Sequence, residues 1–269
     1  MKSEKYFVPL QAMKKILDLT VCRNERISDH HVLLRLTHDE RLPEMIPGQF
    51  VEVRIDQTPS VFLRRPISIC FVDRTVNELW LLVATIGDGT RWLGTLKVGD
   101  IVNCVLPLGN GFAPLQSSHI PRLPLLIGGG VGVAPLLYLG ACLQQAGSEV
   151  TFLLGGRSAK DVLLLDEFKK YGRVQVTTED ATLGEKGFVT NHSVLTNEHF
   201  DAIYTCGPTP MMKAVVRYAR EKHIECEASL ENMMACGLGA CLCCVEKTTE
   251  GNLCVCKEGP VFNMNRLLW

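Results

Sequence analysis

The pattern of hydrophobic and polar residues changes once along the chain, at Pro121. Before that point, short alternating or apolar runs are separated by glycine and proline, as at Pro47-Gly48. This pattern is typical of antiparallel strands and predicts a β-barrel, with one short helix beginning after Thr90. The predicted strands are Lys15–Cys22, His31–Leu36, Phe50–Ile55, Ile67–Val72, Leu79–Ile86 and Ile101–Leu106.

After Pro121 strands alternate with helices, which indicates a parallel sheet with helices on both faces. The predicted strands are Leu123–Ile127, Val150–Leu154, Val174–Thr177 and Ala202–Thr205, and the predicted helices are Pro135–Gln145, Leu164–Tyr171 and Pro210–Lys222. The last segment, Glu227–Trp269, is rich in cysteine and follows neither pattern. We therefore expect a mixed fold with an antiparallel β-barrel at residues 12–118, a parallel-sheet α/β domain at 119–229 and a small C-terminal lobe at 230–269.

Length and charge fit this division and exclude some functions. A chain of 269 residues can hold two domains that each bury a core. The net charge of -1 and the scattered lysines and arginines leave no basic patch for nucleic acid or anionic lipid. The apolar stretch Leu123–Leu143 is long enough to be considered as a membrane span. Its glycines and prolines fit a strand, a turn and a helix better. The N-terminus lacks the apolar core of a signal peptide, so we expect a cytoplasmic protein with reduced thiols.

The cysteines are concentrated in the C-terminal lobe, since seven of the twelve follow residue 225. In a reducing compartment such a cluster points to metal or redox chemistry. Cys236, Cys241 and Cys244 follow the spacing C-x4-C-x2-C, and Cys256 comes after eleven further residues. This is the spacing associated with plant-type [2Fe–2S] ligation. The four cysteines are therefore the predicted cluster ligands.

Two alternatives remain at the cysteines. A structural zinc site favours paired C-x2-C motifs, and because the chain has only one clean pair, the spacing favours an iron–sulfur cluster. Cys243 and Cys254 each lie within two residues of a predicted ligand, so either can replace it. Gly237 and Gly239 lie inside the first loop, where the backbone must curl around inorganic sulfide and offer N–H donors.

The barrel half contains two motifs that suit a pyrophosphate. Arg65-Pro66-Ile67-Ser68 is followed by Gly89-Thr90, which begins twenty-four residues after Arg65. The arginine can pair bidentately with a phosphate, and a turn before a helix presents free N–H groups to an anion. Taken alone, an arginine before proline is more often a solvated strand end, so the motif depends on its companions.

Two loops of the α/β half suit a dinucleotide. Gly128-Gly129-Gly130-Val131-Gly132 follows a strand and opens a helix, as does Cys206-Gly207-Pro208. Both loops are therefore expected at the carboxyl ends of parallel strands, where ligands bind. Cys206 is either an ordinary buried thiol or a catalytic-site residue beside a nicotinamide ring. Arg157 either marks a 2′-phosphate or is a plain surface charge, which leaves NAD and NADP both open.

With these motifs in order, the chain resembles the ferredoxin–NADP⁺ reductase superfamily, in which an FAD-binding barrel carrying R-x-x-S precedes a nucleotide-binding α/β domain. The runs Glu231–Cys241 and Val255–Phe262 look like those of the electron-transfer subunits of class 1B dihydroorotate dehydrogenase. The resemblance implies that FAD is held by Arg65, Pro66, Ile67, Ser68, Leu82, Val83, Ala84, Gly89 and Thr90. The chain departs from the family pattern at Cys243, where a small residue is expected, and at Ala84, where a polar or basic one is expected.

The resemblance also implies a relay. NAD(H) exchanges two electrons as hydride, a [2Fe–2S] cluster exchanges one at a time, and FAD can do both. The chain shows no substrate-directed acid, base or nucleophile, so we expect a redox partner outside it. The resemblance implies that this partner is an FMN-containing catalytic subunit that oxidises dihydroorotate in pyrimidine synthesis, in a heterotetramer of two copies of each. Leu238, Ala240 and Leu242 either dock that partner or merely cover the cluster.

Other functions remain open from the sequence. A related flavin and iron–sulfur reductase subunit that serves sulfite reductase, a sulfhydrogenase or ferredoxin shares nearly every motif. A zinc-stabilised binding module without redox activity is a second alternative. A self-sufficient oxygenase reductase is a third, although about forty C-terminal residues are too few for its separate ferredoxin domain.

Overall fold

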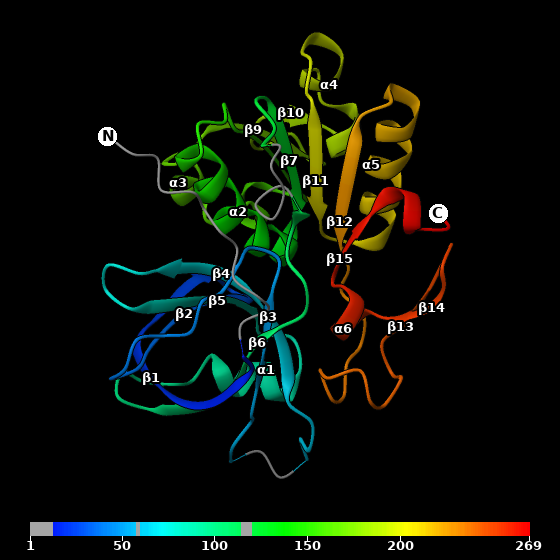
Figure 1. The fold of residues 1–269 in the computed structure, drawn as a ribbon. Helices are drawn as coiled ribbons and strands as arrows, with labels where there is room; N and C mark the ends of the chain where they lie inside the picture. Colours follow the sequence, from blue (N-terminus) through cyan, green and yellow to red (C-terminus); the bar gives the residue numbers. More distant parts are fainter. Residues whose placement is uncertain (1–12, 58–59, 114–119) are drawn as a thin grey trace, which may run out of the picture.

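The structure, a computed structural model, describes residues 13–57, 60–113 and 120–269 (Figure 1). Its first part is a closed barrel with the strand order β1-β2-β5-β4-β3-β6, in which all neighbouring strands are antiparallel. The strands are β1 (Lys15–Ser28), β2 (His31–Thr37), β3 (Phe50–Val53), β4 (Arg65–Asp73), β5 (Glu78–Ala84) and β6 (Ile101–Leu108). Closure leaves no free sheet edge, and the barrel prediction is confirmed.

The helix α1 (Asp88–Leu93) begins earlier than the sequence predicted. Gly87 is its N-cap, and the Thr90 hydroxyl both accepts a hydrogen bond from the Gly87 N–H and donates one to the Gly87 carbonyl, each at 3.1 Å. Thr90 therefore lies inside the first helical turn, where its side chain caps the helix. The expectation of a helix that begins after Thr90 was wrong for this reason.

The second part is a seven-stranded sheet with the order β10-β9-β8-β7-β11-β12-β15. Its strands are β7 (Pro124–Gly129), β8 (Thr151–Gly156), β9 (Arg173–Thr178), β10 (Glu185–Lys186), β11 (Ala202–Cys206), β12 (Glu225–Ser229) and β15 (Val261–Asn263). All are parallel except β15, which pairs antiparallel with β12. The parallel α/β sheet is thus confirmed, with one antiparallel edge strand supplied by the C-terminal segment.

Helices cover both faces of this sheet. Leu126 of β7 packs in one cluster with Leu136 of α2 (Ala134–Gln145), whereas its neighbour Leu125 packs in another with Val215 of α5 (Thr209–Lys222). Successive strand residues point to opposite faces, so one apolar strand supplies both cores. The shorter elements are η2 (Gly130–Val133), η3 (Ala159–Asp161), α3 (Leu165–Phe168), η4 (Val189–Asn191), α4 (Val194–Asn197) and η5 (Met264–Arg266).

Two further predictions need correction. The helix predicted at Leu164–Tyr171 is limited to α3: it begins at Leu165, because Leu164 is its N-cap in a left-handed conformation with φ of 55°, and it ends at Phe168. The C-terminal segment, in which no regular pattern was expected, contains β15, α6 (Val255–Glu258) and a hairpin of β13 (Val245–Thr248) and β14 (Gly251–Cys254). Strands this short carry too few residues for a period to show.

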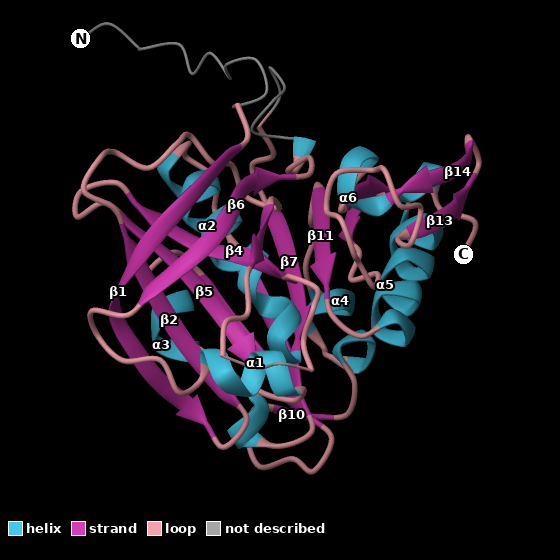
Figure 2. Cartoon of the chain, turned by 90° about the horizontal axis from the view of Figure 1, so that it is seen from below, coloured by secondary structure: helices cyan, strands magenta, loops and turns pink. Residues whose placement is uncertain are grey.

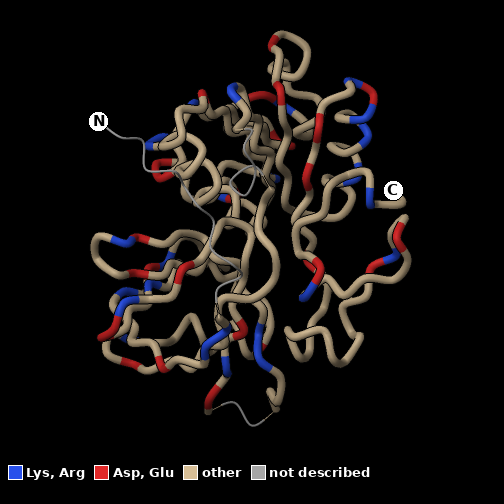
Figure 3. The backbone as a smooth tube through the Cα atoms, viewed as in Figure 1, with Lys and Arg blue, Asp and Glu red and all other residues tan. Residues whose placement is uncertain are grey.

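The stretch considered as a membrane span folds as β7, η2 and most of α2. Over the described residues, no helix combines the length and the apolar character needed to cross a membrane. Figure 3 shows acidic and basic residues interspersed along the backbone rather than gathered in long blocks.

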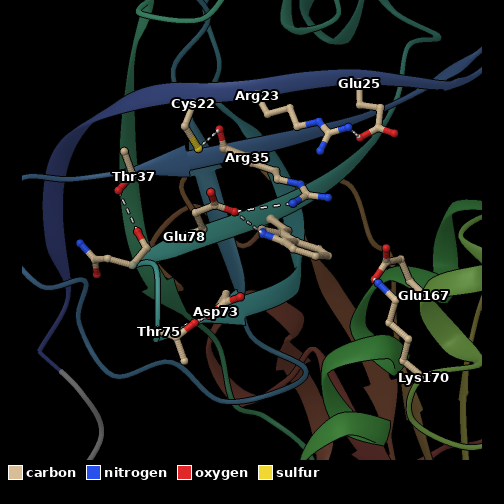
Figure 4. Close-up of polar contacts among 12 residues, drawn as sticks. Cys22, Arg23, Glu25, Arg35, Thr37, Asp73, Thr75, Glu78, Glu167 and Lys170 are labelled. Carbon is tan, nitrogen blue, oxygen red and sulfur yellow. Dashed lines mark hydrogen bonds and ion pairs between the residues drawn. The ribbon is translucent and has the colours of Figure 1, made fainter.

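The barrel contacts the α/β part through aromatic side chains. Tyr138 of α2 donates a hydrogen bond to the Met45 carbonyl at 3.1 Å, and its ring lies 5.6 Å from Phe71 of β4. On the adjacent strands of the barrel, Arg35 of β2 lies over the ring of Trp80 and faces Glu78, both of β5 (Figure 4). In both ribbon views the β13–β14 hairpin lies on the side of the molecule away from β1 (Figures 1 and 2).

Candidate functional site

The two glycine-containing loops of the α/β part lie side by side at the carboxyl ends of β7 and β11. Cys206 pairs with Gly128, and the chain passes from β7 toward β8 on one side and from β11 toward β12 on the other. Ligands bind at such a topological switch point. The loops touch through their backbones, because a Cβ on Gly132 would lie 2.5 Å from the Gly207 Cα. Only glycine fits at this contact.

The remaining residues predicted to bind the nucleotide lie around this contact. Gly129 is closed in by the Met211 sulfur, 2.7 Å from a built Cβ, whereas Gly130 faces open space. Pro208 is the N-cap of α5. Arg157 follows the neighbouring strand β8, is exposed, and has no ion pair or hydrogen bond from its guanidinium to the described part of the chain. The structure thus brings together every predicted residue of the two loops and leaves Arg157 at their margin.

Cys206 is fully buried at the base of this crevice. Burial raises the pKa of its thiol well above the usual value, and the nearby Glu231 carboxyl group raises it further. The Cys206 thiol points to that carboxyl group, with Sγ 3.9 Å from Oε1. A raised pKa favours the neutral thiol at Cys206 over the thiolate. Glu231 was not singled out from the sequence, and its only signal is its place just before the cysteine loop.

The two predicted phosphate motifs of the barrel meet in space. A Cβ on Gly89 would lie 3.1 Å from the Arg65 Nε. Within the described residues, the Arg65 guanidinium donates to the carbonyls of Leu63, at 3.0 Å, and Arg64, at 3.2 Å, and forms no ion pair with an acidic side chain. Arg64 instead ties strands together by donating to the Glu52 and Asn103 carbonyls. Of the two arginines, Arg65 is therefore the one available to a ligand.

The other residues predicted to bind FAD are less open. Ile67 and Ser68 pair with β3, and all of Pro66, Ile67 and Ser68 are half-buried. Leu82 and Val83 are buried in β5, and Ala84 ends that strand opposite His31. These β5 residues therefore offer mainly backbone groups at the end of the strand. Thr90 uses its hydroxyl to cap α1.

The predicted cluster cysteines form two pairs. The Cys236 and Cys241 side chains interact with each other, as do those of Cys244 and Cys256. The Cys256 N–H also donates to the Cys244 sulfur at 3.4 Å. Among the described residues, no three Cys, His, Asp or Glu side chains gather as they would around a single ion.

Backbone N–H groups converge on these sulfurs. The Leu238 N–H donates to the Cys236 sulfur at 3.4 Å, and the Gly239 N–H donates to the Cys256 sulfur at 3.1 Å. Burial acts to raise the pKa of Cys236, but backbone hydrogen bonds from the loop outweigh it and lower this pKa to about 6. At Cys256 burial and the Cys244 thiol raise the pKa to about 12. A loop that points N–H donors at thiolate sulfur fits an iron–sulfur cluster.

The two alternative ligands occupy different positions. Cys254 is buried beneath the same loop, where its thiol lies 4.0 Å from the Gly239 carbonyl oxygen. Cys243 is exposed and has no hydrogen bond to the described residues.

The cysteine lobe is fixed to the barrel at two points. The Asn110 N–H donates to the Gly259 carbonyl at 2.6 Å, and its side-chain amide donates to the Lys257 carbonyl at 3.0 Å. At the second point, Glu52 of β3 lies against Gly237. Burial raises the pKa of Glu52 to about 7, although Arg64 acts to lower it. The only sequence signal for Glu52 is an acidic residue inside the apolar strand Phe50–Val53.

The loop that carries the cysteines also carries exposed apolar side chains. Met233, Leu238 and Leu242 are 85%, 48% and 65% exposed, and we refer to these three residues as the lobe patch. Residues 232–245 contain no charged side chain, and this stretch is uncoloured in Figure 3. Exposed apolar side chains grouped in this way are typical of a docking surface.

Comparison with known proteins identifies two domains of this chain. Residues 231–268 match the family described as the iron–sulfur cluster binding domain of dihydroorotate dehydrogenase B, and residues 126–217 match the oxidoreductase NAD-binding domain. The solved structure of an NADH-dependent reduced ferredoxin-NADP oxidoreductase has a TM-score of 0.79 and 28% identity, covering 93% of this chain and 90% of that one.

Curated relatives extend the match over most of the chain. A protein of Shouchella clausii is 40% identical over 82% of this chain and 86% of its own length, and one of Bacillus velezensis is 40% identical over 93% of this chain and 97% of its own length. Both are named dihydroorotate dehydrogenase B (NAD(+)), electron transfer subunit. The chain has a reductase-type barrel, an NAD-binding domain and an iron–sulfur domain. It is an NAD-linked oxidoreductase subunit that uses FAD, a [2Fe–2S] cluster and NAD. The chain belongs to the family of dihydroorotate dehydrogenase B electron transfer subunits.

Proposed function

We propose that this chain relays electrons from a dihydroorotate-oxidising partner to NAD⁺ in the cytoplasm. The observation that carries this proposal is the contact between the cysteine lobe and the barrel. Glu52 touches Gly237 of the cysteine loop and lies opposite Pro66 of the flavin motif on the paired strand. Electron transfer requires carriers held close together, and through Glu52 the cysteine loop contacts the strand that pairs with the flavin motif. None of the twelve cysteines, all of them in the described residues, forms a disulfide, which suits a reducing compartment.

The proposed cluster ligands are Cys236, Cys241, Cys244 and Cys256. Their arrangement as two pairs suits a cluster in which each of two irons takes two thiolates, and it suits a single tetrahedral zinc ion less well. The Leu238 and Gly239 N–H groups would then lie beside the ligand sulfurs and stabilise their negative charge.

The proposed FAD residues are those of the two barrel motifs, and the proposed NAD residues are those of the two glycine loops. Bound FAD exchanges two electrons with NAD and one at a time with the cluster. Arg65 has no acidic partner and can pair with the pyrophosphate, and the Gly132–Gly207 contact shapes the crevice for the nucleotide. Cys206 and Glu231 would lie at the nicotinamide end of that crevice. There the Cys206 thiol would keep its proton and donate it in a hydrogen bond to the Glu231 carboxyl group.

The proposed division of the chain is 12–118 for FAD, 119–229 for NAD and 230–269 for the cluster. The proposed partner is an FMN-containing catalytic subunit, in a heterotetramer of two copies of each. Support for a partner comes from the names of the relatives and from the uncharged lobe patch beside the proposed ligands.

The test is reconstitution. The chain is purified anaerobically, its FAD, iron and sulfide are measured, and it is mixed with the FMN-type catalytic subunit from the same organism. We expect a stable complex that reduces NAD⁺ when dihydroorotate is added. Failure of this complex, together with coupling to another acceptor, would leave only a general electron-transfer function.

A ferredoxin-linked reductase is the second candidate. The observation in its favour is the similarity to the NADH-dependent reduced ferredoxin-NADP oxidoreductase over 93% of this chain. Reduced ferredoxin offered in place of the catalytic subunit distinguishes the two, because only this candidate predicts ferredoxin-dependent reduction of a nicotinamide nucleotide.

A further inference from the structure

Glu52 is a buried carboxyl group to which the described fold gives no partner. It is 1% exposed, and neither carboxylate oxygen has a hydrogen bond. Burying a carboxyl group without partners costs free energy, so a group left in this state calls for a functional explanation.

Arg64 and Arg65, the charged residues that act on Glu52, donate their hydrogen bonds to other groups. The Arg64 guanidinium donates to the backbone carbonyl of Glu52 and to Asn103, and not to the carboxylate. The Arg65 guanidinium donates to the carbonyls of Leu63 and Arg64. Neither arginine forms an ion pair with Glu52, although the charges of both arginines act on its carboxyl group and favour the ionised form.

The side chain of Glu52 is directed at the cysteine loop. A Cβ on Gly237 would lie 2.7 Å from the Glu52 Cγ and 2.9 Å from its Oε1. Gly237 follows Cys236 directly and has φ of 64°, so the loop turns over the carboxyl group at the only residue type that leaves it room.

We propose that Glu52 is a positioning residue whose carboxylate, held beneath the cysteine loop, lowers the reduction potential of the bound cluster. This inference rests on the proposed function and its ligand set. In a medium of low dielectric, a nearby negative charge disfavours the arrival of an electron, and local charge is one of the terms that set cluster potentials. A lower potential favours electron flow from the cluster toward FAD, which is the direction needed to reduce NAD⁺.

The test compares Glu52→Gln with Glu25→Gln in the full-length holoprotein. The first variant removes the charge beneath the loop and keeps the side-chain size. The second removes the charge of Glu25, which pairs with Arg23 on β1 and is 38% exposed. In both ribbon views β1 lies on the far side of the barrel from α6 (Figures 1 and 2). Iron, sulfide and FAD are measured first, and the cluster is then titrated by EPR at fixed potentials in alkaline buffer, so that the carboxyl group is ionised.

We expect Glu52→Gln to keep its iron and FAD and to raise the ratio of reduced to oxidised cluster about tenfold at a given potential, which is about 59 mV for a one-electron carrier. Glu25→Gln should match the wild type, and Glu52→Asp, which keeps the charge, should shift less than Glu52→Gln. An unchanged ratio in Glu52→Gln, or an equal change in Glu25→Gln, overturns the inference.

Loss of iron from Glu52→Gln with FAD retained also overturns it, because the contact would then serve only to hold the loop. A wild-type chain that contains no iron and sulfide would refute the proposed function and this inference together. A wild-type chain with a normal cluster, beside an unshifted Glu52→Gln variant, refutes only the role of Glu52.

Discussion

At the scale of single residues, the proposed ligands differ from Cys243 in their surroundings. Cys241 and Cys243 are both exposed, but Cys241 interacts with the Cys236 sulfur, which also accepts a backbone hydrogen bond, whereas Cys243 has no such contact to the described chain. We expect Cys241→Ser to lose the cluster and keep FAD, because a serine hydroxyl replaces a thiolate ligand poorly. Cys243→Ser is the matched control and should keep its iron.

Iron, acid-labile sulfide and the visible spectrum after anaerobic purification decide this prediction. Cys241→Ser should still reduce two-electron dyes with NADH, since hydride transfer precedes the cluster. The reverse pattern, with iron lost from Cys243→Ser alone, would mean that Cys243 is a ligand in place of Cys241.

Arg65 carries the second prediction at this scale. Its guanidinium donates only to backbone carbonyls, so pairing with a phosphate would add charge-assisted hydrogen bonds. Such bonds contribute about 1.5–3 kcal/mol, so Arg65→Ala should weaken FAD binding about tenfold to a hundredfold and leave the iron in place. Arg54→Ala removes an exposed arginine paired with Asp56 and serves as the control. Flavin fluorescence on dilution measures the release, and a parallel loss of iron would mean that Arg65 supports the fold.

At the scale of elements, the sequence predicted what repeats and missed what depends on contacts between distant segments. The helix Pro210–Lys222 was predicted to within one residue of α5, because its apolar residues recur at helical spacing. The strand β15 was missed, since three residues carry no period and its pairing with β12 is settled by the fold. Glu52 was missed for the same reason, because its importance comes from Gly237, which is far away in the sequence.

The contact between the two glycine loops gives a prediction at this scale. Because a Cβ on Gly132 would lie 2.5 Å from the Gly207 Cα, Gly132→Ala should push the loops apart. Overpacking of this kind costs about 1–3 kcal/mol of folding free energy and distorts the crevice. We expect a lower melting temperature and a raised KM for NADH in dye reduction. Gly87→Ala is the control for the KM, since a Cβ there meets nothing within 4 Å, although as an N-cap change it can itself lower the melting temperature. Unchanged values for Gly132→Ala would show that the loops have room to separate.

At the scale of the whole molecule, the α/β domain, the barrel and the cysteine lobe contact one another in that order, and the lobe carries exposed apolar residues. The α/β domain packs on the barrel through Tyr138, the barrel holds the lobe through Asn110, and the lobe ends in the lobe patch. Nothing in the described fold suggests a site for a pyrimidine. Purified alone, the chain should therefore oxidise NADH with dyes and should not act on dihydroorotate or orotate, which an assay of each substrate with and without the partner will show.

The lobe patch is where that partner should bind. Leu242 is 65% exposed and has φ of 60°, a conformation that aspartate tolerates better than most residues, so Leu242→Asp places a charge in the patch without straining the loop. We expect this variant to keep its iron and FAD and to bind the catalytic subunit at least about tenfold more weakly, because a charge must be desolvated in an apolar interface. Val98→Asp places the same charge on an exposed apolar residue of the barrel and should bind normally. If both variants bind like the wild type, the apolar residues beside the cysteines only cover the cluster, and the partner must reach it from another face of the lobe.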